Sequence, residues 1–251
     1  MPQGRLQGKR VLVTGAAGGV GAALARRMVA EGARVLLADV DRDGGERLAR
    51  DLGPQALFVA LDVAVPLAWD GAMDLAASTW GGLDVLVNNA AIASPVVPID
   101  QRDPADWDRM MAVNLGGPFL GARAALPLFR KGGGGVIVNV SSVAGLGQSG
   151  IMDPAYACGK AGLTMLTRVI AAQHAYDGVR CNSVHPGPID GPMARAAYAD
   201  TGAIARRLSR IPAGRFADVE EVVSAVLYLA SEESSYVTGV ALGVDGGALV
   251  Q

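Results

Sequence analysis

Short apolar runs alternate with alanine-rich segments of helical length along the whole chain. Runs such as RVLVT (10–14) and ALFVA (56–60) hold consecutive apolar residues rather than an apolar–polar alternation, which is typical of strands covered by helices on both faces. The segment 20–32, which ends at Gly32, has the length and composition of a helix. This order predicts an α/β fold built on an open, mostly parallel and doubly wound sheet.

The pattern predicts seven strands and no division into smaller units. Strands are expected at 10–14, 34–39, 56–60, 83–88, 135–142, 179–184 and 240–244. Helices are expected at 20–32, 43–52, 67–79, 105–130, 155–176 and 218–231. Because no repeat, linker or shift of composition interrupts them, residues 1–251 are predicted to form a single Rossmann domain. In such a sheet, ligands bind beyond the carboxyl ends of the strands.

The composition argues against several classes of protein. With a net charge of −2 and no lysine or arginine cluster, the chain lacks the basic surface of a nucleic-acid-binding protein. Its N-terminus has no long apolar stretch, so no signal peptide or membrane span is expected. The spacing of Cys158 and Cys181 suggests neither a disulfide nor a metal site, and only two histidines, His174 and His185, are present. We expect a cytoplasmic protein without a metal, nucleic-acid or membrane partner.

A glycine-rich turn follows the first predicted strand. In TGAAGGVG (14–21), Gly15, Gly19 and Gly21, with Val20 among them, lie between that strand and the next helix. Glycines at such a turn allow a backbone to approach a pyrophosphate, which then lies at the helix N-terminus. The same turn can be purely structural. An acidic residue about 20 positions further on would favour dinucleotide binding.

Asp39 is that acidic residue, at the end of the second strand, although acidic residues are also common in ordinary strand-end turns. A carboxylate there can accept hydrogen bonds from an adenosine ribose and would repel a 2′-phosphate, so NAD is favoured over NADP. Arg42 lies close enough to keep NADP open as an alternative. Asp62 and Val63, after the third strand, are candidates for contacts with the adenine.

Asn89 follows the fourth strand, within NNAA (88–91). It is a candidate cofactor residue, although asparagines at strand ends commonly bind only backbone groups.

Tyr156 and Lys160 stand four positions apart in YACGK, so on a helix they share a face. A tyrosine, with a pKa near 10, is a poor base at neutral pH. A nearby ammonium, together with a positively charged nicotinamide, would stabilise the phenolate and lower that pKa. Lysines are rare here, at positions 9, 131 and 160 only. Taken alone, the pair is also explained as part of an ordinary helix.

Two further residues support the catalytic interpretation of this pair. Ser142 ends the fifth strand, where its hydroxyl could hold a substrate oxygen, although Ser141 is a rival and strand-end serines often only cap turns. Asn114 lies within the long helical segment, where asparagine is mildly unfavourable. It either faces solvent or anchors a water molecule or a backbone carbonyl in a proton path.

Together these motifs resemble the short-chain dehydrogenase/reductase family over essentially the whole chain. The matching stretches are TGAAGGVG, Asp62, NNAA, Asn114, Ser142, YACGK and HPGPI at 185–189. The resemblance implies that Asn114, Ser142, Tyr156 and Lys160 form a catalytic tetrad with tyrosine as the acid/base, and that the backbone at Ile189 holds a carboxamide. The sequence departs from the family pattern at Ala91, Gly159 and Gly191, where glycine, serine and threonine are usual.

The resemblance also implies a substrate lid over 188–215, with Met193 and Tyr198 as candidate contacts, and Gln148, Ile151 and Met152 in the loop before Tyr156 as others. We expect an NAD-dependent oxidoreductase that interconverts a secondary alcohol and a ketone, as a homotetramer or homodimer. The alternatives are an NADPH-dependent ketoreductase, including one for acyl-carrier-bound ketones, and a sensor that binds NAD without turnover. The two histidines are expected to be structural.

Overall fold

The strands form one parallel sheet in the order β3-β2-β1-β4-β5-β6-β7. The structure is a computed structural model that describes residues 4–147, 152–191 and 201–250. Its strands are β1 (Arg10–Thr14), β2 (Arg34–Asp39), β3 (Ala56–Ala60), β4 (Val85–Asn88), β5 (Gly135–Val140), β6 (Val179–Pro186) and β7 (Ala241–Val244). The prediction of a parallel sheet is confirmed, and no antiparallel pair occurs among the described strands.

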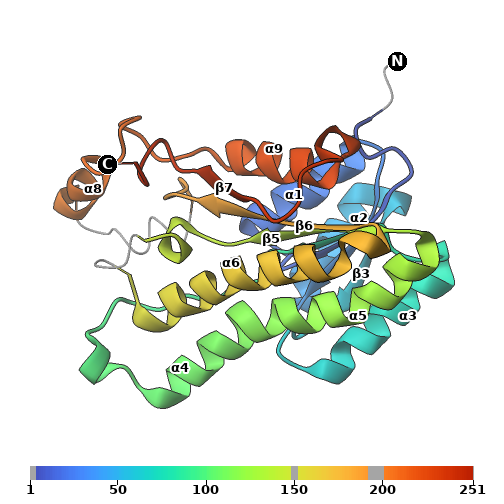
Figure 1. Cartoon of the computed structure of the whole chain (residues 1–251), viewed down its shortest axis with the longest axis horizontal. Coiled ribbons are helices and arrows are strands. Elements are labelled where there is room, and N and C mark those ends of the chain that lie inside the picture. Colours follow the sequence, from blue (N-terminus) through green and yellow to red (C-terminus); the bar gives the residue numbers. More distant parts are fainter. Residues whose placement is uncertain (1–3, 148–151, 192–200, 251) are drawn as a thin grey trace.

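Helices cover both faces of the sheet (Figure 1). They are α1 (Gly19–Ala30), α2 (Arg42–Leu52), α3 (Pro66–Trp80), α4 (Pro104–Met111), α5 (Gly117–Gly132), α6 (Pro154–His174), α8 (Thr201–Leu208) and α9 (Val219–Ala230). Buried residues of α1, α2 and α9 share one apolar core with the sheet, and those of α3, α5 and α6 share the other. This double burial explains why the strands are consecutively apolar.

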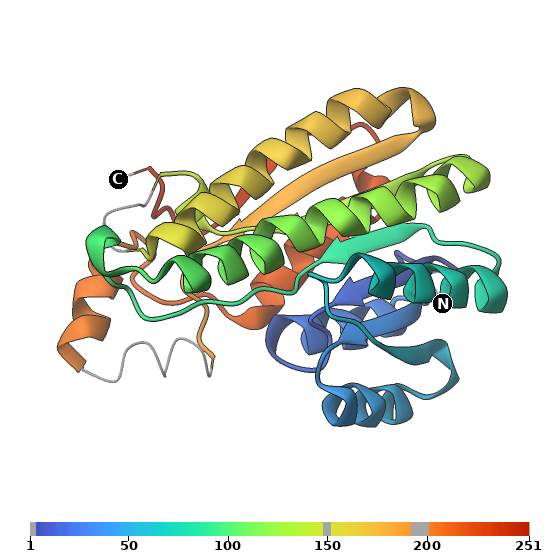
Figure 2. The ribbon, with the colours of Figure 1, turned by 90° about the horizontal axis from the view of Figure 1, so that it is seen from below.

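The carboxyl ends of the strands point to one end of the molecule. The strand order reverses between β1 and β4, so the turns after these two strands leave the sheet in opposite directions. The start of α6 and the helix α8 lie at this same end in both views (Figures 1 and 2). The candidate residues that follow β1, β2, β4 and β5 are therefore brought to a single edge. Among the described residues, we find no helix that is both long and apolar enough to span a membrane.

The helix predicted at 105–130 is interrupted. A π-helical turn, Ala112–Gly116, separates α4 from α5. Pro118 has no N–H, so it cannot donate the usual α-helical hydrogen bond to the carbonyl of Asn114, four residues earlier. Such turns are frequent at functional sites. The sequence pattern did not reveal this irregularity.

Candidate active site

In the glycine turn after β1, backbone atoms pack closely against one another. Gly15 and Gly19 have φ angles of +65° and +52°, a region that favours glycine. A Cβ atom at Gly21 would lie 1.9 Å from the Gly15 carbonyl oxygen. Val20 packs against the core that contains α1. The turn therefore needs small residues to bring the start of α1 against β1.

The same turn leaves open space around Gly18 and Gly19. A Cβ atom at Gly18 or Gly19 would meet nothing within 4 Å, and no side chain caps the start of α1. A helix N-terminus that is not capped presents N–H groups that suit an anion. The turn thus has the open cradle and the donors that a dinucleotide pyrophosphate requires.

Asp39 and Asn89 hold this turn in place. The carboxylate of Asp39 accepts hydrogen bonds from the backbone N–H groups of Ala17, at 2.8 Å, and of Asp41, at 3.0 Å. The amide of Asn89 donates to the carbonyl oxygens of Thr14 and Gly15, at 2.9 and 3.2 Å. Both residues therefore have a structural task at the predicted cofactor site, which is the alternative that the sequence leaves open for each.

Three other candidate cofactor residues surround the same edge. Asp62 is exposed and accepts a hydrogen bond from the N–H of Ala64 at 2.9 Å, whereas Val63 is buried. Ile189 lies just beyond β6 and bridges to Ala217. Their contacts with a cofactor remain predictions.

Tyr156 and Lys160 lie in the first turns of α6 and share one face of it. The Lys160 ammonium is buried, donates to the carbonyl of Val140 at 2.8 Å, and lies 5.7 Å from the centre of the Tyr156 ring. The phenol forms a hydrogen bond with the side chain of Ser142. The structure thus brings together three of the four predicted catalytic residues.

The two neighbouring serines have different partners. The Ser141 hydroxyl donates to the carbonyl of Lys160 at 3.1 Å, which ties β5 to α6. The Ser142 hydroxyl is the one directed at the phenol. His185 donates from Nδ1 to the Ser142 carbonyl at 2.8 Å, and burial lowers the pKa of this histidine. His185 therefore fixes the Ser142 backbone, the structural role expected for it.

Asn114 is completely buried in the π-helical turn. Its side chain accepts from the N–H of Ile92 and donates to the carbonyl of Ile92, both at 2.9 Å. The solvent-facing alternative is wrong because the side chain pairs with backbone beyond β4. At Gly159, an added Cβ atom would lie 3.2 Å from the Asn114 Cβ, so glycine lets α6 approach this turn closely.

Burial dominates the electrostatics of the pair. It raises the pKa of Tyr156, and the hydrogen bond with Ser142 opposes that rise. It lowers the pKa of Lys160 to about 8. The expected lowering of the tyrosine pKa by lysine is not found within the protein alone, because Lys160 donates to a backbone carbonyl and both groups are removed from water.

This burial predicts how the Lys160→Met variant behaves. The pKa of Lys160 falls from 10.5 in the unfolded chain to about 8 in the folded protein. Between these values the unfolded state binds more protons at this lysine, so the contribution of Lys160 to the stability of the wild type rises with pH, by on the order of 3 kcal/mol in all. Loss of the hydrogen bond to Val140 costs the variant about 1 kcal/mol. We expect Lys160→Met to be more stable than the wild type by roughly 2 kcal/mol at pH 7, with the difference closing towards pH 10.

Urea unfolding at several pH values between 7 and 10 measures this difference. Lys131→Met, at an exposed position near the end of α5, is the matched control. A difference between Lys160→Met and the wild type that stays constant with pH would contradict the burial argument.

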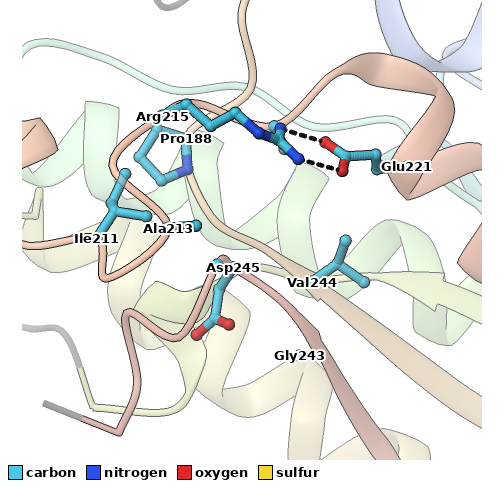
Figure 3. Close-up of a pocket in the computed structure, with 10 residues that line it drawn as sticks. Pro188, Ile211, Ala213, Arg215, Glu221, Gly243, Val244 and Asp245 are labelled. Atoms are coloured by element: carbon cyan, nitrogen blue, oxygen red, sulfur yellow. Dashed lines mark hydrogen bonds and ion pairs between the residues drawn. The ribbon is translucent and has the colours of Figure 1, made fainter.

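A pocket lies beyond β7, between the strand end and the segment 211–217 (Figure 3). Arg215 donates to the two carboxylate oxygens of Glu221 at 2.7 and 2.8 Å, which anchors this segment to α9. Pro188, directly before Ile189, forms part of the lining. The C-terminal end of the predicted lid region, 188–215, is therefore held to α9.

The other lid predictions are only partly described. Met193, Tyr198, Gln148 and Ile151 lie outside the described residues, whereas Met152 is described and partly buried. An added Cβ atom at Gly191 would meet nothing within 4 Å. No group of three or more histidine, cysteine, aspartate or glutamate side chains that could hold a metal occurs in the described ranges.

Known proteins match this chain over nearly its full length. A family model described as enoyl-(acyl carrier protein) reductase matches residues 15–248. A 3-alpha-(or 20-beta)-hydroxysteroid dehydrogenase of Mycobacterium tuberculosis (strain ATCC 25618 / H37Rv) is 40% identical, covering 98% of this chain and 91% of the relative. A cis-4-hydroxycyclohexanecarboxylate dehydrogenase of Sinomonas cyclohexanicum is 43% identical, covering 94% of each.

A third relative is a 2,5-dichloro-2,5-cyclohexadiene-1,4-diol dehydrogenase of Sphingobium indicum (strain DSM 16412 / CCM 7286 / MTCC 6364 / B90A), 35% identical over 97% of both chains. All three relatives are dehydrogenases by name, and the resemblance inferred from the motifs is confirmed. On this evidence, the chain belongs to the short-chain dehydrogenase/reductase family.

Proposed function

We propose that the protein is an NAD-dependent oxidoreductase that interconverts a secondary alcohol and its ketone. The observation that supports this most directly is the hydrogen bond between the Ser142 side chain and the Tyr156 phenol, with the Lys160 ammonium beside the same ring. A hydroxyl and a phenol that share one hydrogen bond can both accept or donate to a single substrate oxygen. All of residues 1–251 would form one catalytic domain.

In this proposal, Ser142 and Tyr156 hold the substrate oxygen. When the alcohol is oxidised, the Tyr156 phenolate accepts the hydroxyl proton, and in the reverse direction the phenol returns it. Hydride transfer to or from the carbon is the chemistry that a bound nicotinamide would supply. Lys160 stabilises the phenolate once its ammonium faces the ring rather than the Val140 carbonyl. Asn114 supports the proton path through its backbone carbonyl, which Pro118 cannot bond.

The cofactor would bind at the carboxyl-end edge of the sheet, beside the glycine turn. Gly15, Gly19, Val20 and Gly21 would face the pyrophosphate at the start of α1. Asp39 would accept from the ribose hydroxyls with lone pairs that its two backbone donors leave over. Asp62 and Val63 would contact the adenine, Asn89 would line the passage, and the Ile189 backbone would hold the carboxamide.

NAD is favoured over NADP by the surroundings of Asp39. A 2′-phosphate placed at this ribose would meet the Asp39 carboxylate. Arg42 is the nearest basic candidate, and in α2 it is exposed and lies 3.6 Å from Glu46. Surface pairs of this kind are weak, so Arg42 keeps the NADPH-dependent ketoreductase as the alternative to be tested.

The substrate class follows from the relatives. A hydroxysteroid, a hydroxycyclohexanecarboxylate and a cyclohexadienediol are all hydroxylated ring compounds. Cyclic secondary alcohols are therefore the first choice among polyols, sugars and cyclic or aryl alcohols. We further propose a cytoplasmic homotetramer or homodimer.

The test is a panel of cyclic alcohols, hydroxysteroids, diols and sugars, each with NAD⁺ and NADP⁺, in which nicotinamide reduction is followed. We expect turnover of cyclic secondary alcohols with NAD⁺. Turnover mainly with NADP⁺ would support the ketoreductase, and NADH-dependent or NADPH-dependent reduction of an enoyl thioester would support the activity after which the family model is named. Tight NADH binding without any turnover would support the sensor.

A further inference from the structure

A buried ion pair holds the start of the helix that carries Tyr156. Arg102, between β4 and α4, pairs with Asp153, directly before α6, and their side chains are only 7% and 3% exposed. The two residues are 51 positions apart in the chain. Neither was a candidate from the sequence, and neither belongs to the predicted tetrad.

Asp153 carries out two tasks with one carboxylate. Its Oδ1 atom accepts from the backbone N–H groups of Ala155, at 3.0 Å, and of Tyr156, at 3.1 Å. Its Oδ2 atom accepts from Nη2 of Arg102. The carboxylate therefore caps the helix through the N–H of Tyr156 itself and joins that residue to the arginine.

Arg102 connects this cap to the other side of the site. Its Nη2 atom also donates to the carbonyl of Pro95 at 3.0 Å, and Nη1 donates to Asp106 at 3.5 Å. Its Nε atom is buried and has no hydrogen-bond partner in the described structure. Nearer the start of the same connection, the backbone of Ile92 is bound by the side chain of Asn114. The connection 92–103 is thus fixed near both ends by residues that lie against α6 or next to it.

Stability alone does not explain a charge pair at this place. A buried ion pair is often no more stable than apolar side chains of similar volume, because both charges lose their hydration. What the arginine adds is direction, since its planar guanidinium holds Asp153, the Pro95 carbonyl and Asp106 at the same time.

We infer that Arg102 and Asp153 are positioning residues, which hold the first turn of α6 so that the Tyr156 phenol stays opposite Ser142. This inference rests on the proposed function, in which Tyr156 transfers the proton. A displacement of about 1 Å at a reacting group can lower a rate by about 100-fold. The pair acts through Tyr156 and needs no contact with the substrate or cofactor.

The test compares variants that separate the cap from the charge. Asp153→Asn keeps a capping oxygen but loses the ion pair, because asparagine caps helices as well as aspartate does. Arg102→Met removes the charge and keeps most of the side-chain length. For both, we expect kcat to fall by about 10- to 100-fold, with the KM for NAD⁺ within about twofold of the wild type. Because they break the same contact, the double variant should lose no more than the worse single variant.

Two controls separate positioning from a general loss of structure. Arg102→Lys keeps the charge but not the planar guanidinium, so it should recover only part of the kcat that Arg102→Met loses. Asp103→Asn makes the same change at the cap of α4, where Asp103 is exposed and accepts from the N–H of Ala105 at 2.9 Å, and it should leave kcat unchanged. Amide hydrogen exchange over 152–160 should be faster in Arg102→Met than in the wild type, and this measurement does not depend on activity.

Unchanged exchange over 152–160 would overturn the inference. So would a kcat within threefold of the wild type in both Arg102→Met and Asp153→Asn, even if both melt at lower temperature. The variant Tyr156→Phe is assayed in parallel. If it still turns over, the proposed function has failed, whereas if it is inactive and the two positioning variants are fully active, only the present inference has failed.

Discussion

Replacing Tyr156 by phenylalanine is expected to lower kcat by about 10³-fold or more, with NADH binding nearly unchanged. The substitution removes only the phenolic oxygen, so the packing of the ring at the start of α6 is preserved. Positioned proton transfer contributes about 10²- to 10⁴-fold to a rate, and the Ser142 hydroxyl alone cannot replace it because its own proton is held too tightly at neutral pH. The measurement is steady-state turnover of the best alcohol from the panel, together with fluorescence titration of NADH.

The matched control is Tyr176→Phe. Tyr176 lies just after α6 and is fully exposed, so removal of its hydroxyl should not change kcat. If Tyr156→Phe kept more than about a tenth of the wild-type kcat, general acid/base catalysis by this residue would be excluded, because that loss is smaller than such catalysis contributes. A parallel loss of NADH binding would instead indicate that the phenol holds the cofactor.

The sheet could be predicted from the sequence because its signals are local. Most strands contain a consecutive apolar run followed by a turn or a helix, and burial on both faces favours that pattern, although β6 also holds polar residues. The glycine turn is also local, since strand, glycines and helix are adjacent in the chain. The break at Asn114 was not predicted, although Pro118 carries a signal for it. The missing N–H of a proline removes the bond to the carbonyl four residues earlier.

Contacts between segments that are distant in the chain could not be predicted from the sequence. Asp153 followed by Pro154 is a recognisable helix start, but nothing in the sequence shows that Arg102 lies beside it. The same holds for Lys160, whose lowered pKa depends on burial under β5. Tyr156 shows the limit most clearly. Its neighbour Lys160 suggested a lowered pKa, whereas burial raises it, and burial depends on the whole fold.

The Gly21→Ala variant is expected to lose both stability and cofactor binding. Its Cβ atom would lie 1.9 Å from the Gly15 carbonyl oxygen and 2.8 Å from Nδ2 of Asn89. Backbone atoms cannot turn aside as a flexible side chain can, so the start of α1 has to move away from β1. Overpacking of this severity costs about 3 kcal/mol or more, which lowers the melting temperature by roughly 6–12 °C in a chain of this size.

The same displacement should weaken NADH binding by about 100-fold, because the N–H groups at the start of α1 move from the positions that an anion requires. Gly18→Ala is the control for stability. Gly18 has extended backbone, with φ at −157°, and an added Cβ atom there meets nothing within 4 Å. Its melting temperature should stay within about 2 °C of that of the wild type, since alanine restricts the unfolded chain but is a poorer N-cap residue than glycine. Differential scanning calorimetry and NADH titration test both variants. If Gly21→Ala melts within about 2 °C of the wild type, the turn can yield at that point, and the close contact between α1 and β1 is not what fixes the cofactor edge.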